Sequence, residues 1–258
     1  MREPLDPSGR LASVASLVSG IVGLTLLGVT VVLAVRMAQV EPVATGDQTV
    51  VTSATVATGG ATATGTGGSG PTQSVDPTWL ASSSAATGIP SRALEAYASA
   101  SLVADAESPD CGLGWNTVAA IGAIETGHGT FGDSAIDGDG WARPAILGPR
   151  LDGQGFAAIS DTEGGTLDGD PIWDRAVGPL QFIPSTWARW GADGNGDGVS
   201  DPHQIDDAAL AAARYLCHDG STTTPAEWRR AVHSYNHSDE YVDQVASRAN
   251  QYAAAVDG

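Results

Sequence analysis

Glu125 is the only charged residue between Asp110 and Asp133, in the stretch AAIGAIETGHGTFG. It follows Val118 and Gly122 at helical spacing, so it lies on their face of a predicted helix. Burial raises the pKa of a carboxyl group, and an acid that keeps its proton near neutral pH can act as a general acid. The other interpretation is a glutamate at a frayed helix end, in solvent or bound to an arginine.

The glycines behind this glutamate, Gly127 and Gly129, would let a substrate approach the helix end closely. The glutamate has no obvious carboxylate partner in its own segment.

A second stretch of polar residues, GADGNGDGVSDPHQIDD, has the oxygen spacing of a calcium loop. Positions 1, 3, 5 and 7 of an EF-hand loop are occupied by Asp193, Asn195, Asp197 and Val199. Position 12 is Gln204 rather than glutamate, so the ordinary loop is incomplete. All-oxygen ligands favour calcium over magnesium, and the alternative is a set of Asp-Gly turns without an ion.

Other polar pairs fit metal chemistry less well. His233 and His237 have zinc-ligand spacing, but no His-Glu-x-x-His pattern accompanies them. Two aspartate pairs are typical of turns rather than of a second cation site: Asp137 with Asp139, and Asp168 with Asp170. The chain also lacks the Gly-x-Ser-x-Gly pattern of serine hydrolases.

Residues 77–258 must position these groups, because they hold all seven tryptophans and both cysteines of the 258-residue chain. They are enough for one well-buried domain. Without a convincing alternating strand pattern, we expect a mainly α fold in which Phe182 and Trp187 belong to the core. The segment 127–177 is predicted to be irregular. Apolar spacing or capping residues predict helices over 90–107, 114–126, 206–220, 224–236 and 238–256, and a short helix from Pro184.

An uncharged segment, residues 11–35, lies between Arg10 and Arg36. As a helix it would span roughly 37 Å, against a hydrocarbon core of about 30 Å. We predict a transmembrane helix, with a cleaved signal peptide as the alternative. The positive-inside rule places residues 1–10 in the cytoplasm and the C-terminal domain outside a single-pass membrane anchor.

Residues 36–76 consist mostly of Thr, Ala, Gly, Ser and Val. Such a composition cannot bury a core, and it predicts a flexible linker between the membrane and the domain. An exported domain with exactly two cysteines favours a disulfide between Cys111 and Cys217, the alternative being two reduced, buried thiols.

The charge balance excludes one class of partner. The chain has 12 basic residues, all arginine, and 30 acidic ones, giving a formal charge of −18. Binding phosphates requires a basic face, so nucleic acid is not an expected partner.

Five motifs together resemble the lytic murein transglycosylases of the MltB type, particularly their exported actinobacterial branch. Each motif alone is weak, but they stand in one order over about 130 residues: IGAIETGHGTFG, GPLQFIPSTW, DGNGDGVSDP, AALAAARYLC and SYNHSDEYV. The resemblance implies a lysozyme-like, mostly helical fold. It also implies cleavage of the β-1,4 bond between N-acetylmuramic acid and N-acetylglucosamine in peptidoglycan glycan strands.

The resemblance assigns Glu125 as the single catalytic acid. It implies attack by the muramoyl 6-hydroxyl on C1, which gives a 1,6-anhydro product without water or a cofactor. Gln181, Tyr235, Asn236 and Tyr241 are implied to bind the sugar.

The same resemblance implies a longer calcium loop that Asp207 closes. Arg143 and Arg150 are the candidates for arginines that hold the peptide or the sugar, although segment 127–177 departs from the family pattern. Two alternatives remain at this point: a muramidase of the same fold that uses water, and a non-catalytic, calcium-dependent wall-binding module. Protein partners are not predicted.

Overall fold

The structure is a computed structural model that describes residues 74–257. The predicted cytoplasmic segment 1–10, the membrane helix 11–35 and the linker up to residue 73 lie outside these residues. Among the helices between residues 74 and 257, none has both the length and the apolar character needed to cross a membrane.

The described chain is mainly helical, which confirms the predicted class. Its helices are α2 (Pro77–Thr87), α3 (Ser91–Glu107), α4 (Trp115–Thr126), the 3-10 turn η1 (Phe131–Asp133), α5 (Pro184–Trp190), α6 (Ile205–Cys217), α7 (Pro225–Tyr235) and α8 (Asp239–Asp257). Its short strands are β1 (Ala135–Ile136), β2 (Ala142–Arg143), β3 (Leu147–Arg150) and β4 (Arg175–Val177).

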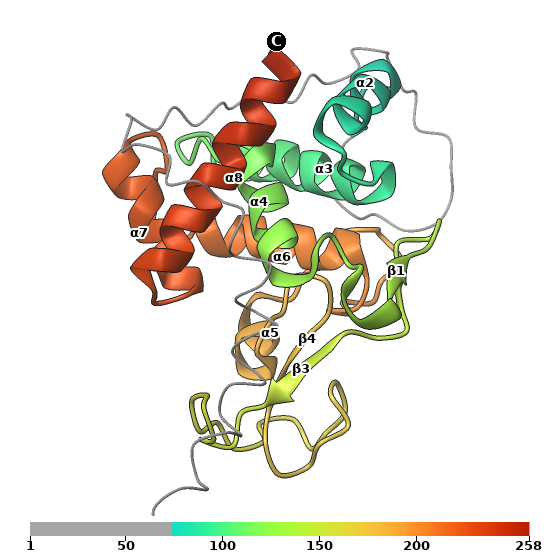
Figure 1. Cartoon of the computed structure of the whole chain (residues 1–258), viewed down its shortest axis with the longest axis vertical. Coiled ribbons are helices and arrows are strands. Elements are labelled where there is room, and N and C mark those ends of the chain that lie inside the picture. The colour runs from blue at the N-terminus through green and yellow to red at the C-terminus, as the bar shows by residue number, and fades with distance from the viewer. Residues whose placement is uncertain (1–73, 258) are drawn as a thin grey trace, which may run out of the picture. The chain divides into compact units, whose positions relative to one another are not determined.

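Helix α4 is the centre of the domain, with α3, α6 and α8 around it (Figure 1). Its residues from Trp115 to Gly122 are buried, as expected for a helix that is apolar on nearly all sides. Gly122 permits the close approach of α3, because a Cβ at this position would lie 2.3 Å from Oη of Tyr97. Phe182 and Trp187 are buried in the same core, as predicted.

Local capping explains where two of the helices begin. Thr224 and Glu227 form a capping box at the start of α7, in agreement with the helix predicted over 224–236. Helix α2 was not predicted, because its serine-rich sequence has little apolar periodicity. Asp76 starts it by accepting hydrogen bonds from the backbone N–H groups of Thr78 and Trp79.

The disulfide between Cys111 and Cys217 is present, as predicted. It joins the loop before α4 to the last residue of α6. The bridge therefore closes a long segment that includes α4 and all four strands.

The predicted irregular segment 127–177 contains two small antiparallel sheets. Strand β1 pairs with β2, and β3 pairs with β4. Figure 1 shows β3 and β4 below α6, with the loop 151–174 beyond them. These strands gave no signal in the sequence, because strands of two to four residues are too short to show an alternating pattern.

Candidate active site

Glu125 lies in the last turn of α4 and is partly buried. The hydroxyl group of Tyr241, in the first turn of α8, donates a hydrogen bond of 2.6 Å to its Oε1 atom. Burial raises the pKa of Glu125 to about 7, and the hydrogen bond from Tyr241 acts in the opposite direction. The side chain therefore exchanges a proton near neutral pH, as a general acid must.

Glu125 is neither fully exposed at a frayed helix end nor paired with an arginine. None of the ion pairs among residues 74–257 includes Glu125, so no arginine neutralises it. The hydrogen bonds described for the same residues bring no second carboxylate to it either. Within the described part of the chain, Glu125 is thus a carboxyl group with no charged partner at hydrogen-bond or ion-pair distance.

Gln181 lies in a tight hairpin turn between β4 and α5. The backbone N–H and C=O groups of Val177 and Phe182 pair across this turn. Gln181 has a φ of 51°, in the left-handed region that costs a non-glycine residue about 1–2 kcal/mol. Its Nε2 atom donates to the carbonyl of Gly178 at 2.9 Å. Strain of this kind is often found at functional sites.

Two hydrogen bonds attach this hairpin to the helices that carry the other candidates. Oγ1 of Thr126 donates to the carbonyl of Pro179 at 2.6 Å. The hydroxyl group of Tyr235, the last residue of α7, donates to the carbonyl of Leu180 at 2.7 Å. The turn that contains Gln181 therefore lies between the ends of α4 and α7.

The ring of Tyr235 packs among other aromatic rings beside the hairpin turn that contains Gln181. Its ring lies 5.8 Å from that of Phe182 and 5.7 Å from that of Tyr215. Burial and the nearby charge of Glu125 raise the pKa of Tyr235. Asn236 differs from the other candidates, because it is exposed at the end of α7 and its described hydrogen bonds come from its backbone.

Thr126 is a site residue that the sequence analysis missed, although it stands beside the acid in the ETG motif. It also accepts a hydrogen bond from the N–H of Gly129. Gly129 was expected to leave room for substrate, but this was wrong. A Cβ there would lie 2.5 Å from Cδ1 of Ile136, so the glycine serves internal packing.

The predicted calcium loop is organised by two carboxylates. Asp193 accepts hydrogen bonds from backbone N–H groups of residues 196–198, and Asp207 from those of residues 194, 195 and 201. Burial raises the pKa of Asp207 to about 6, and the charge of Asp193 adds to the effect. None of the ion pairs of the described residues neutralises either group.

The candidate ligand atoms of this loop fit a hard cation such as calcium, because all of them are oxygen atoms. Asn195 and Asp197 are joined by a side-chain hydrogen bond of 3.0 Å, and the side chain of Val199 is exposed. Gln204, at position 12, does not serve as a ligand candidate, because its side chain caps α6. This explains why the ordinary EF-hand pattern ends before that residue.

A different acidic cluster also could hold a metal ion. Among the described residues, the group of three acidic side chains whose ligand atoms lie within 4.8 Å of one another is Asp161, Glu163 and Asp174. Asp161 and Asp174 also accept hydrogen bonds from the backbone of residues 162–165. Each therefore already has a structural role in the loop 151–174.

Asp137, Asp170 and the candidate arginines have structural partners. Asp170 binds Arg150 at 2.6 Å and Arg175 at 3.5 Å. Asp137 lies 3.2 Å from the exposed guanidinium of Arg143 and caps its own turn. The aspartate pairs thus lie in turns, as predicted, and Asp137 and Asp170 also form ion pairs with Arg143 and Arg150.

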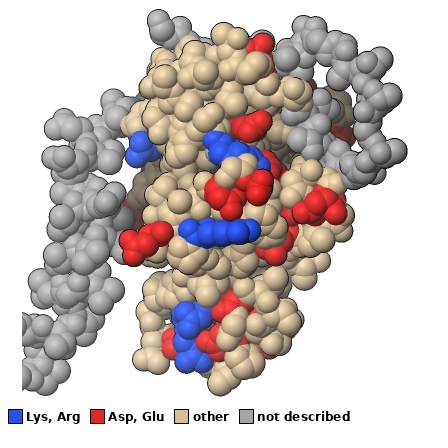
Figure 2. Space-filling model, turned by 90° about the vertical axis from the view of Figure 1, so that its right-hand side faces the viewer, with Lys and Arg blue, Asp and Glu red and all other residues tan. Residues whose placement is uncertain are grey.

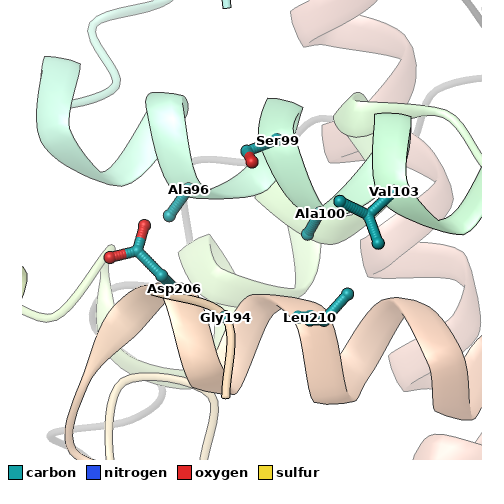
Figure 3. Close-up of a pocket in the computed structure, with 7 residues that line it drawn as sticks. All are labelled: Ala96, Ser99, Ala100, Val103, Gly194, Asp206 and Leu210. Atoms are coloured by element: carbon teal, nitrogen blue, oxygen red, sulfur yellow. The ribbon is translucent and has the colours of Figure 1, made fainter. Parts of the chain in front are cut away.

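Two pockets lie away from Glu125. The one between α3 and α6 has a volume of about 10 Å³, which suits a single water molecule (Figure 3). Its lining is Ala96, Ser99, Ala100, Val103, Gly194, Asp206 and Leu210. A wider pocket of about 250 Å³ lies beside Trp190, Arg214 and His218. Neither contains a predicted sugar-binding residue.

Figure 2 shows how the charged side chains are distributed on one face of the described domain. On the face that Figure 2 shows, the arginine side chains lie beside acidic ones and do not gather into a basic patch. Ion pairs of the described residues also join Arg92 to Asp206, Arg214 to Glu107 and Arg229 to Asp243. This distribution does not favour binding to a phosphate backbone.

No protein with a curated description and no solved structure matches the chain. Residues 168–254 match the sequence model of the family described as the transglycosylase SLT domain. The matched segment includes Gln181, Tyr235, Tyr241 and the whole loop from Asp193 to Asp207. Glu125 lies before the matched segment. Tyr241 of that segment donates a hydrogen bond to Glu125, and the neighbouring Thr126 donates one to Pro179 within it. The C-terminal half of the described domain is therefore similar to transglycosylase SLT domains.

Proposed function

We propose that this protein is a membrane-anchored lytic transglycosylase. It cleaves the β-1,4 bond between N-acetylmuramic acid and N-acetylglucosamine in peptidoglycan and leaves 1,6-anhydro ends. The observation that carries the proposal is the partly buried Glu125, which has Tyr241 as its hydrogen-bond partner and no ion-pair partner among residues 74–257. The match of residues 168–254 to the transglycosylase SLT domain supports the substrate class.

In the proposed reaction, Glu125 gives its proton to the glycosidic oxygen while the bond from C1 to that oxygen breaks. The muramoyl 6-hydroxyl then attacks C1, and its proton passes to the carboxylate of Glu125. The acid is thereby restored, and water does not enter the product. Because Tyr241 donates to Oε1, the transferable proton is held by Oε2.

Gln181, Tyr235 and Asn236 are proposed to bind the sugar. The hairpin that holds Gln181 is fixed to Thr126 and Tyr235 by hydrogen bonds, so sugar-binding groups would keep a constant position relative to the acid. The exposed side chain of Asn236 is available to a ligand.

The loop from Asp193 to Asp207 is proposed to hold a structural calcium ion, with the side chains of Asp193, Asn195, Asp197 and Asp207 and the backbone carbonyl of Val199 as ligands. The ion would stabilise the loop rather than take part in the reaction, because none of its proposed ligands is a residue proposed to act on the sugar. The reaction itself requires no cofactor, since the acid and the substrate hydroxyl perform each step.

The membrane anchor is proposed to be residues 11–35, which places the domain outside the cell. Membrane fractions washed with alkaline carbonate test this proposal. The full chain should stay in the pellet, and a chain that lacks residues 1–36 should leave it. Release of the full chain by the wash would rule out a spanning anchor.

The rival from another class is a wall-binding module without catalysis. Glu125→Gln keeps the shape of the side chain but removes the acid, so it should abolish glycan cleavage and preserve sedimentation with wall fragments. Glu95→Gln, on the exposed face of α3, is the matched control and should retain cleavage. Unchanged wall-dependent activity in Glu125→Gln would support the rival.

A further inference from the structure

We propose that His128 is a positioning residue for Glu125: by joining Tyr97 to Tyr252, it holds the end of α4 where Glu125 meets Tyr241. The kinetic part of this inference rests on the proposed function of Glu125. The positional part does not, because it concerns the environment of the carboxyl group in the free protein.

The backbone after α4 has an unusual conformation. Gly127, His128 and Gly129 have φ values of 61°, 62° and 80°, so three successive residues are left-handed. Glycine adopts this region freely, whereas the Cβ atom of histidine makes it sterically unfavourable. The N–H group of His128 donates to the carbonyl of Gly122 at 2.8 Å and closes the helix. A histidine at this position therefore needs a compensating contact from its side chain.

The imidazole ring supplies that contact on both of its edges. Nδ1 lies 3.3 Å from Oη of Tyr97 on α3, and Nε2 lies 2.9 Å from Oη of Tyr252 on α8. A neutral imidazole has one donor and one acceptor, so one tyrosine hydroxyl can accept while the other donates. The three side chains are buried, and together they link α3 and α8 through the residue that follows α4.

The ring stays neutral under physiological conditions. Burial lowers the pKa of His128 to about 4, and the charge of Arg248 contributes to this effect. Arg248 lies on α8, with its guanidinium carbon 5.8 Å from the centre of the Tyr252 ring. The link from His128 is therefore a fixed hydrogen-bond arrangement at neutral pH rather than a switch.

Helix α8 thus contacts the end of α4 at two places. Tyr241 binds Glu125 before the left-handed turn, and Tyr252 binds His128 within it. On the other side, Tyr97 of α3 packs against Gly122, one turn before the acid. A shift of the helix end would lengthen the contact between Tyr241 and Glu125 and admit water to the carboxyl group. Misplacement by about 1 Å can cost an enzyme about a hundredfold in rate.

The experiment compares His128→Asn with wild type in the full chain. Asparagine tolerates the left-handed region, so this change removes the imidazole with little added backbone strain. His203→Asn is the matched control, because it removes a half-buried imidazole that contacts the carbonyl of Leu167 instead. Tyr252→Phe removes only one hydroxyl from the link and replaces His128→Asn if that variant does not fold.

The first measurement is the pKa of Glu125 without substrate, obtained from the proton uptake of each form minus that of the same form carrying Glu125→Gln. We expect it to fall from about 7 toward the ordinary 4.5 in His128→Asn and Tyr252→Phe, and to stay unchanged in His203→Asn. The second measurement is kcat on peptidoglycan, which should fall about 10- to 100-fold with little change in KM.

A purely structural histidine gives a different result. In that case His128→Asn lowers the melting temperature but leaves both the pKa of Glu125 and kcat at their wild-type values, and the proposal is overturned. If wild type itself cleaves no glycan, the proposed function fails, whereas the proton-uptake measurement still decides the role of His128.

Discussion

The hydroxyl group of Tyr241 donates a 2.6 Å hydrogen bond to Oε1 of Glu125, and this contact joins the first turn of α8 to the last turn of α4. It is the direct link between the proposed acid and the segment similar to transglycosylase SLT domains. The contact has a second consequence, since it stabilises the ionised form of a carboxyl group that burial otherwise keeps protonated.

Tyr241→Phe should therefore raise the pKa of Glu125 above about 7. The ring remains, so the hydrogen bond is the main loss. We expect kcat to fall about 10- to 100-fold, because the carboxylate formed during the reaction loses a donor. The limb of the pH–rate profile at high pH should move to higher pH.

Tyr215→Phe is the control for that variant. Its hydroxyl also donates one short hydrogen bond, but to the carbonyl of Ser234 rather than to Glu125. Its pH profile should resemble that of wild type. An identical shift in both variants would mean that the effect is not specific to the acid.

The stability of the domain should also report the protonation of Glu125. Its pKa is raised from 4.5 to about 7 on folding, so the folded state favours the protonated form. The resulting stabilisation is complete below pH 4.5 and is lost as pH rises through about 7. Glu125→Gln, which cannot ionise, should therefore gain stability relative to wild type above pH 7.

Thermal unfolding of wild type and Glu125→Gln between pH 4 and pH 9 measures this effect. The difference in unfolding free energy should move in favour of the variant by roughly 1–3 kcal/mol between the two ends of the range. A difference that is constant with pH would contradict the raised pKa.

Removal of the disulfide should destabilise the domain without removing a catalytic group. Cys111 and Cys217 are 106 residues apart, and closing so long a loop restricts the unfolded chain. We expect the double variant Cys111→Ala/Cys217→Ala to lose about 2–5 kcal/mol of stability. Reductant should lower the melting temperature of wild type and leave that of the double variant unchanged; a wild-type protein that ignores reductant would exclude a stabilising bridge.

Calcium should stabilise the domain through the loop from Asp193 to Asp207. A chelator is expected to lower the melting temperature of wild type, and Asp197→Ala should abolish this response. Glu163→Gln tests the other acidic cluster and should keep the response. Loss of the response in Glu163→Gln alone would indicate that the cation binds to the group of Asp161, Glu163 and Asp174. Equal melting temperatures of wild type with and without chelator would exclude a tight site.

Much of this fold could be predicted from the sequence because local signals agree with the final packing. The segment 114–126 is apolar on nearly all sides, and it forms the buried helix that carries Glu125. Thr224 and Glu227 show the start of α7 through a capping box. The pair of cysteines in a domain expected to be exported was enough to propose the bridge.

Other features depend on contacts between distant residues and have no local signal. Thr126 binds the carbonyl of Pro179, and Gln181 adopts a left-handed conformation that sequence pattern would assign to glycine or asparagine. The strands are too short for a periodic pattern. His128 resembles an ordinary loop residue until Tyr97 and Tyr252 are placed on either side of it.

The central claim is that Glu125 acts alone and that the substrate supplies the nucleophile. Its most direct test is digestion of purified peptidoglycan in water enriched in ¹⁸O, followed by mass spectrometry of the released fragments. Fragments from wild type should end in 1,6-anhydro-N-acetylmuramic acid, lack one water relative to hydrolysis products and carry no ¹⁸O at the new end. Glu125→Gln should release none. Fragments with reducing ends that contain ¹⁸O would contradict the account and indicate a hydrolytic muramidase.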